Sequence, residues 1–256
     1  MVAKNLILER TIKPLADRFI NMSNALARSA QGLTLSEKRV VSMALAKTDS
    51  IPAKDAALAQ FRNGWTVHLT AEEYAKEFGI SDDVAYVQLK DAADNLIKRH
   101  VRTMMETVRG LKEIKTNWCG QCIYHHGEGW VEISFTPQIA PHLLGLRSQF
   151  VSYKLKQASA LRSIYSWRLF ECLQSWGSKG KWSPSIEDFM HAMDVPDSYQ
   201  KDFANLRIRV IEPALKELRE KDNQVIEMTL KKSGRKITGL VFVYRPNPQA
   251  SLDFQP

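Results

Sequence analysis

The segment that best predicts the fold of the C-terminal half is Tyr199–Tyr244, with the sequence YQKDFANLRIRVIEPALKELREKDNQVIEMTLKKSGRKITGLVFVY. Apolar residues recur at helical spacing over Tyr199–Lys221 and form one face of a long helix. Two strand-like runs follow, Val225–Leu230 and Ile237–Tyr244, with a turn around Ser233–Gly234 between them. The segment therefore predicts a long helix followed by a β-hairpin.

The preceding residues supply the remaining elements of a winged-helix domain. They predict a helix over Leu161–Trp176 ended by Gly177, a strand over Lys181–Ser183, a helix from Pro184 to Met193 and a turn over Asp194–Ser198. Helix, strand, helix, turn, helix and hairpin is the order of elements in a winged helix, whose third helix reads DNA.

The first half of the chain follows the same plan. It predicts a helix over Leu35–Lys47 capped by Thr34 or Ser36, a strand over Trp65–Leu69, a helix over Ala71–Phe78 capped by Thr70 and ended by Gly79, and a longer helix over Asp82–Arg99 capped by Ser81. Strand-like runs follow at Val101–Val108, Gln121–Tyr124 and Gly129–Phe135. Thr48–Gly64 has no clear pattern.

The predicted fold class is α+β, with two tandem winged-helix domains. The expected division is an N-terminal arm at 1–23, a first domain at 24–136, a second domain at 137–245 and a flexible tail at 246–256. Thr136–Pro141 is the expected seam, because two prolines within five residues discourage a continuous helix. The alternative is an unrelated α+β fold without a true repeat.

Composition sets the broad limits. The 256 residues include 44% apolar and 25% charged residues, which are ordinary values for a folded protein. There is no apolar run long enough for a membrane span or a signal peptide. Three cysteines, Cys119, Cys122 and Cys172, favour a reducing cytoplasm over a disulfide scaffold. The expected location is therefore the cytoplasm.

Positive charge is concentrated in the second half. The formal net charge is +8, of which +2 lies in residues 1–136 and +6 in residues 137–256. The long helix of the second half carries four polar or basic residues in its N-terminal part: Lys201, Asn205, Arg207 and Arg209. Asn pairs with adenine and Arg with guanine in the major groove, so these are the expected reading residues, although Arg207 lies nearer the buried edge.

The hairpin tip is the second predicted DNA contact. Residues 231–236 hold four cations and no acid, namely Lys231, Lys232, Arg235 and Lys236. Such a basic wing beside a basic helix is typical of a protein that grips the DNA backbone. Additional backbone contacts are expected near the seam from Lys154, Lys156, Arg162 and Arg168. The long helix of the first half is instead acidic (Asp82, Asp83, Asp91 and Asp94), which opposes entry into a groove.

Several motifs resemble one family. FVSYKLKQASALRSIYSWRLFECL (Phe150–Leu173) and FANLRIRVIEPALKEL (Phe203–Leu218), with the KKSGRK wing, resemble the plasmid replication initiators that bind iterons, the repeated sites of a theta-type origin. LTLSEKRV (Leu33–Val40) and VEISFTPQIAPHL (Val131–Leu143) resemble the same family. The order and spacing agree over roughly residues 24–245.

The resemblance implies a mechanism. Two winged helices would bind one iteron of double-stranded DNA. The C-terminal domain would make the main base contacts, and the N-terminal domain would make backbone contacts and mediate dimerisation. Monomers would help to open the origin and recruit the host initiator and replicative helicase, and dimers would repress the initiator's own gene at an inverted repeat. No membrane partner is implied. A transcriptional repressor without an initiation role is the first alternative.

Enzyme chemistry is not indicated. Neither a P-loop nor a hydrolase triad signature is present, so no catalytic activity and no cofactor are expected. Cys119, Cys122, His125 and His126 offer four potential zinc ligands within eight residues, but the expectation is a hairpin turn with free thiols. A metal-dependent nuclease centred on His125 and His126 is the second alternative function.

Overall fold

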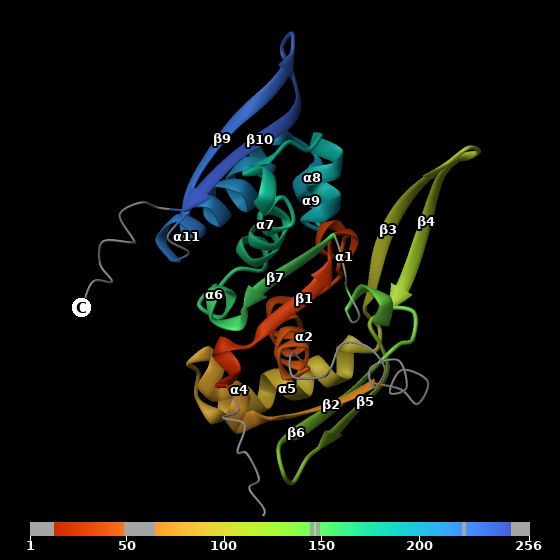
Figure 1. Ribbon diagram of the computed structural model, residues 1–256, viewed down its shortest axis with the longest axis vertical. Coiled ribbons are helices and arrows are strands. Elements are labelled where there is room, and N and C mark those ends of the chain that lie inside the picture. The colour runs from red at the N-terminus through yellow and green to blue at the C-terminus, as the bar shows by residue number, and fades with distance from the viewer. Residues whose placement is uncertain (1–12, 49–64, 144–145, 147–148, 222–223, 247–256) are drawn as a thin grey trace, which may run out of the picture.

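The computed structural model describes residues 13–48, 65–143, 146, 149–221 and 224–246. The first winged helix begins with α2 (Leu35–Lys47), followed by β2 (Trp65–Thr70), α4 (Ala71–Phe78) and α5 (Asp82–Leu96) (Figure 1). Thr34 and Glu37 form a capping box on α2, and Thr70 and Glu73 form another on α4. Both follow from the T-x-x-E spacing. Gly79 ends α4 in a left-handed conformation with φ +59°, as predicted.

Two separate β-units complete this half. β2 pairs with β6 (Trp130–Phe135), which pairs with β5 (Cys119–His125). β3 (His100–Thr107) pairs with β4 (Gly110–Asn117) and makes one isolated bridge, from Arg102 to Ala30, and this hairpin projects from the body (Figure 1). The sequence did not predict β4. It also placed the end of the preceding helix at Arg99, whereas α5 ends at Leu96, and Ser81 makes no side-chain cap on it.

A strand pair joins segments that lie far apart in the sequence. β1 (Phe19–Ser23), from the predicted N-terminal arm, pairs antiparallel with β7 (Phe150–Lys154), from the predicted second domain. Three short helices flank this ladder: η1 (Leu15–Asp17), α1 (Asn24–Arg28) and α6 (Leu155–Ser159). A further 3-10 turn, η2 (Ala140–His142), overlaps the C-terminal end of the predicted seam. The division after residue 136 stays a prediction, and the tail 247–256 lies outside the described residues.

The elements from α7 onward have the order that the sequence predicts for the second winged helix. They are α7 (Ile164–Gln174), η3 (Gly177–Lys179), β8 (Lys181–Trp182), α8 (Ile186–Ala192) and α9 (Asp197–Gln200). The last strands, β9 (Gln224–Ser233) and β10 (Lys236–Pro246), form a hairpin, and β10 also pairs with β8. Trp182, Phe189 and Phe242 stack in its core.

The predicted helix over Tyr199–Lys221 is not continuous. α9 ends at Gln200, and α10 (Phe203–Leu206) begins after Asp202, whose side chain accepts a hydrogen bond from the Asn205 amide. A π-helical segment (Arg207–Ile211) then leads into α11 (Glu212–Lys221). The Glu212 amide bonds to the Arg207 carbonyl, and Pro213 has no N–H to continue the ordinary ladder at the next position.

Buried charges join α2 to α7. Nζ of Lys38, on α2, lies 2.5 Å from Oε1 of Glu171, on α7, and both side chains are fully buried. Arg168 donates to the other Glu171 oxygen at 2.7 Å and to the carbonyls of Ala27 and Ala192. The prediction that Arg168 contacts the DNA backbone is therefore wrong, because only 1% of this residue is exposed. Its fork of donors is used to satisfy backbone and carboxylate oxygens of the core.

Candidate nucleic-acid interface

The wing is the most basic exposed feature of the second winged helix. β9 and β10 meet at Ser233 and Lys236, and Gly234 has φ +60° in the turn. All six residues of the tip are exposed, and the hairpin stands out at the top of the molecule (Figure 1). Within the described residues, none of the four tip cations has an ion pair. Their charge is therefore available to a polyanion.

The helix beside the wing presents a mixed surface. Arg209 is exposed, and its guanidinium carbon lies 5.3 Å from the ring centre of Tyr199. Ile208 is 64% exposed, whereas Leu206 and Val210 are buried in the core. These three positions agree with the predicted split into a buried and an outward face. The contact with Tyr199 restrains Arg209 without neutralising it.

Three other predicted reading residues lie in different settings. Asn205 is half-buried and donates from its side chain to Asp202 at 2.7 Å. Arg207 is exposed rather than near the buried edge, and it forms an ion pair with Glu212 at 2.7 Å. Lys201 is exposed in the connection between α9 and α10, so it is not on the helix as predicted. The break before Asp202 explains that displacement.

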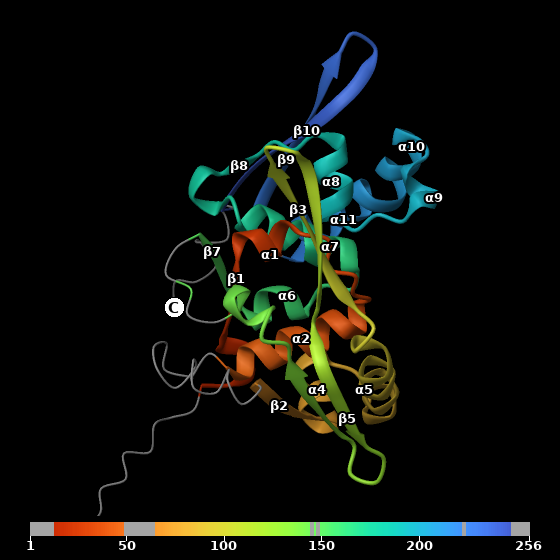
Figure 2. The same cartoon turned by 90° about the vertical axis from the view of Figure 1, so that its right-hand side faces the viewer.

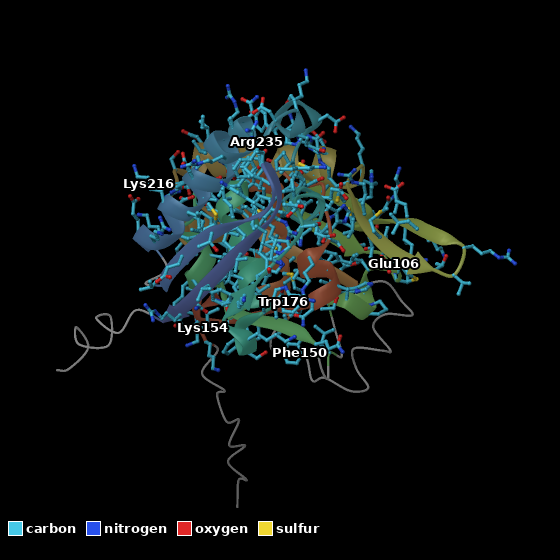
Figure 3. The ribbon with its side chains drawn as sticks, turned by 90° about the horizontal axis from the view of Figure 1, so that it is seen from above. Glu106, Phe150, Lys154, Trp176, Lys216 and Arg235 are labelled. Atoms are coloured by element: carbon cyan, nitrogen blue, oxygen red, sulfur yellow. The ribbon has the colours of Figure 1, made fainter. Side chains whose placement is uncertain are left out.

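The cations predicted near the seam are engaged elsewhere. Lys156 pairs with Asp17 at 2.8 Å, and Lys154 lies 4.0 Å from the same carboxylate. Arg162 donates from its guanidinium to the Phe78 carbonyl at 3.3 Å. Figure 3 shows Lys154 at the opposite edge of the molecule from Arg235. The structure therefore does not bring these residues together with the wing.

α5, the long helix of the first winged helix, and α10, part of the interrupted helix of the second, lie on the same side of the molecule (Figure 2). In Figure 2, α5 lies at the lower right and α10 at the upper right. α5 exposes its acidic first turn, Asp82 and Asp83, together with Val84 and Val87. α11 packs against β9, so the helix that follows Arg209 and the wing belong to one packed unit.

The β3–β4 hairpin is a second projecting ribbon that sequence reasoning missed. Its tip holds Arg109 and Lys112, and it exposes Met104, Met105, Val108 and Leu111. Both hairpins point toward the same end of the molecule (Figure 1). The alternation of apolar and charged residues around Arg109-Gly110 was the signal for a turn between two strands.

The four potential zinc ligands do not converge. The Sγ atoms of Cys119 and Cys122 lie 3.2 Å apart across a bulge in β5. His125 instead stacks on Trp130 and accepts from the Glu128 amide, and His126 lies edge-on to Tyr124. In the part of the chain that the structure describes, no group of three or more His, Cys, Asp or Glu residues is arranged to hold a metal.

Two winged helices, with a basic wing and an exposed arginine on the second, define a class: tandem winged-helix proteins of α+β architecture. Comparison with known families gives the particular family. Residues 19–174 match the family described as Initiator Replication protein, WH1, and residues 185–244 match Initiator Rep protein, WH2. The chain therefore belongs to the family of replication initiator proteins, which confirms the resemblance found in its sequence and the predicted fold class.

Individual relatives agree with this family. An uncharacterized 27.6 kDa protein of Escherichia coli is 25% identical over 89% of this chain and 95% of its own length. A probable replication protein of Bifidobacterium longum is 26% identical over 49% of this chain and 42% of its own length. The crystal structure of the Pi initiator protein in complex with iteron DNA is similar in fold, with a TM-score of 0.72 and 23% identity over 90% of this chain and 97% of that one.

The described residues contain no helix that is long and apolar enough to cross a membrane.

Proposed function

We propose that this plasmid replication initiator binds the iterons of its own origin, with its second winged helix as the principal reader of bases. The observation that carries the proposal is the basic wing, whose four cations lack ion pairs with described residues, on the same packed unit as the exposed Arg209. The wing would contact phosphates, and Arg209 would pair with a guanine edge in the major groove. The similar Pi initiator was crystallised with iteron DNA.

The reading residues would contribute unequally. Arg209 contacts the Tyr199 ring and has no ion pair with a carboxylate among the described residues, so it would lose little interaction energy when it binds a base. Asn205 would have to exchange its bond to Asp202 for a base, and Arg207 would have to leave Glu212 before it reached a phosphate. Lys201, just before the helix, would contact the backbone. Lys154, Lys156 and Arg162 would contribute little.

The remaining parts of the mechanism rest on the family. Self-association, repression of its own gene as a dimer, and recruitment of the host initiator and helicase are proposed on that basis, with the cytoplasm as the site of action because the plasmid lies there. The proposed role is DNA binding, and no catalytic step is part of it. A repressor without an initiation role is the competing function.

The test is binding to the DNA that flanks the gene. Direct repeats of about 20 bp spaced by whole helical turns are expected there, and the full-length chain should shift them in a gel in the presence of excess unrelated DNA. Arg209→Ala should weaken binding by about 1–3 kcal/mol and relax the preference at one base position. Lys216→Ala, an exposed lysine on α11, is the matched control.

Initiation is tested separately. A replicon that carries the repeats but lacks the gene should be maintained only when the chain is supplied from elsewhere. Binding to a single isolated palindrome, with no such maintenance, would assign the protein as a repressor and overturn the initiator function.

A further inference from the structure

A cavity of about 510 Å³ lies between α1, η3, β8 and α8, and none of the proposed DNA contacts lines it. Its size is in the range of pockets that hold small ligands. Its principal side chains are Arg28, Trp176, Lys179, Lys181, Trp182 and His191. Arg28 comes from the part of the chain that matches WH1, and Trp182 lies on β8, which pairs with the hairpin of the second winged helix. A ligand in this cavity would contact both halves of the protein.

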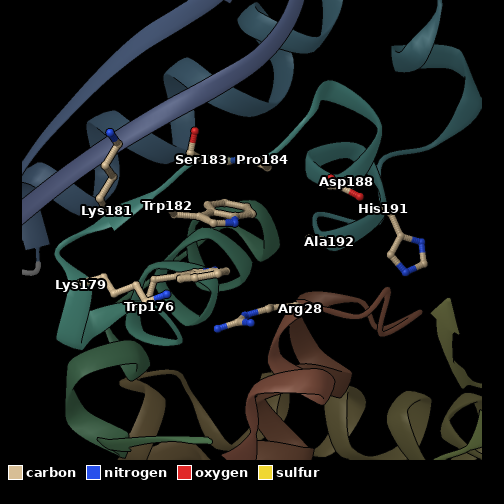
Figure 4. A pocket seen from close by; sticks show the side chains of 10 residues that line it. All are labelled: Arg28, Trp176, Lys179, Lys181, Trp182, Ser183, Pro184, Asp188, His191 and Ala192. Atoms are coloured by element: carbon tan, nitrogen blue, oxygen red, sulfur yellow. The ribbon is translucent and has the colours of Figure 1, made fainter. Parts of the chain in front are cut away.

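Two indole rings form the walls of the cavity. Figure 4 shows Trp182 above and Trp176 below, with open space between them. Trp182 is fixed from behind by Phe242, whose ring centre lies 5.4 Å away at an interplanar angle of 19°. Two rigid aromatic walls suit a planar ring, which stacks on them at little entropic cost.

Trp176 is supported by a cation. The Arg28 guanidinium lies 4.0 Å from the Trp176 ring centre and donates to the Ser175 hydroxyl at 2.9 Å and its carbonyl at 2.7 Å. These contacts hold the Trp176 ring in place, so it can serve as a rigid wall of the cavity.

The charged side chains that line the cavity indicate the charge of the ligand. Arg28, Lys179 and Lys181 have no ion pairs with described carboxylates. The one carboxylate in the lining, Asp188, accepts from Ser185 at 2.7 Å. Burial lowers the pKa of His191, so this ring is neutral at pH 7 and adds no charge. Three such cations beside two aromatic walls match an anion with a planar ring.

We propose that this cavity binds a nucleoside phosphate, with the base between Trp176 and Trp182 and the phosphates at Lys179 and Lys181. The base supplies the planar ring and the phosphates the negative charge, and inorganic phosphate or a free nucleoside would satisfy only half of the site. Because the ligand would bridge α1 and α8, it would favour one relative placement of the two winged helices. This inference goes beyond DNA recognition and does not depend on it.

The test uses the full-length chain and ADP as the probe. Calorimetric titration should show saturable binding of ADP, at least tenfold tighter than that of adenosine or of inorganic pyrophosphate. Lys179→Gln with Lys181→Gln should weaken ADP binding at least tenfold and leave the affinity for the flanking DNA unchanged. Trp176→Leu should reduce ADP binding to the level of pyrophosphate, with retained DNA binding as the check that the variant is folded.

Matched variants separate this site from the DNA surface. Lys231→Gln with Lys232→Gln should weaken DNA binding and leave ADP binding intact. The proposal is overturned by the absence of saturable ADP binding, by equal affinity for ADP and pyrophosphate, or by abolished ADP binding in the wing variant. Tighter binding of an acidic peptide with one phenylalanine would assign the cavity to a protein partner and would also overturn it.

Discussion

The buried Lys38 ammonium makes the stability of this protein depend on pH in an unusual direction. Nζ of Lys38 lies 2.5 Å from Glu171 and donates to Gln31 at 2.8 Å, with its side chain fully buried. Burial lowers the pKa of Lys38 from 10.5 to about 8, although the Glu171 carboxylate opposes this change. Replacing Lys38 with Met keeps much of the side-chain volume and removes the titrating group.

The direction in which stability changes with pH follows from the number of protons bound in the folded and the unfolded state. Below pH 8, Lys38 is charged in both the folded and the unfolded protein, and its burial is fully unfavourable. Between pH 8 and 10.5 the folded state releases this proton while the unfolded state retains it, so the stability of the wild type rises with pH. The slope is up to about 1.4 kcal/mol per pH unit, and the total is about 3 kcal/mol.

The measurement is the difference in unfolding free energy between the wild type and Lys38→Met, from urea denaturation at pH 7, 8, 9 and 10 and constant ionic strength. The wild type should gain roughly 2–3 kcal/mol on the variant over this range. Groups that titrate in both proteins, such as Cys172 with its pKa raised to about 11, largely cancel in the difference. Lys216→Met, at an exposed lysine, is the matched control for the loss of one lysine. A flat difference for Lys38→Met would refute the reasoning, because it would mean that Lys38 keeps its ordinary pKa.

Three further outcomes are expected. Changing the four wing cations to Gln should weaken all DNA binding and reduce the slope of log K against log salt by about 0.9 for each phosphate that the wing no longer neutralises; an unchanged slope would show that the wing does not touch DNA. Gly32→Ala should destabilise the fold by more than the roughly 1–3 kcal/mol of backbone strain alone, since Gly32 has φ +67° and an added Cβ would lie 2.8 Å from the His100 carbonyl. In thermal unfolding, Gly79→Ala should show the strain alone and Gly120→Ala almost no effect; equal destabilisation at Gly32 and Gly79 would contradict the close approach to His100. Metal analysis of chelator-washed protein should find no stoichiometric zinc, since the cysteines and histidines of β5 and the turn after it do not converge, and one zinc per chain would contradict that geometry.

Local rules predicted the elements of this fold well. The capping boxes on α2 and α4 and the left-handed Gly79 are encoded within four or five residues, so the sequence reveals them directly. The β1–β7 pair is different, because its strands are separated by more than a hundred residues and the sequence of neither strand indicates which strand it pairs with. The sequence also did not predict the break at Asp202. This residue is the N-cap of α10, but the helical repeat of apolar residues continues on both sides of it, so in the sequence it resembles an exposed residue within a helix.

The same limit applied to the charged residues. Lys38, Arg168 and Glu171 read as ordinary surface charges in the sequence, because their partners come from distant elements. Glu171 is the partner that Lys38 and Arg168 share, so its removal would leave both cations in the core without their carboxylate. A helical face that carries such residues is therefore not evidence of a DNA contact.

Ion pairing, rather than charge alone, separates the candidate DNA contacts. A cation that already holds a carboxylate gives up that interaction when it binds a phosphate, so its net gain is smaller than that of an unpaired cation. By this criterion the wing and Arg209 are expected to contribute more to DNA binding than Arg207 and Lys156. Arg207 is paired with Glu212, and Lys156 is paired with Asp17. Asn205 is also expected to contribute less, because it would give up its hydrogen bond to Asp202 when it contacts a base. Base reading should therefore depend chiefly on Arg209, and the salt dependence of binding should depend chiefly on the wing.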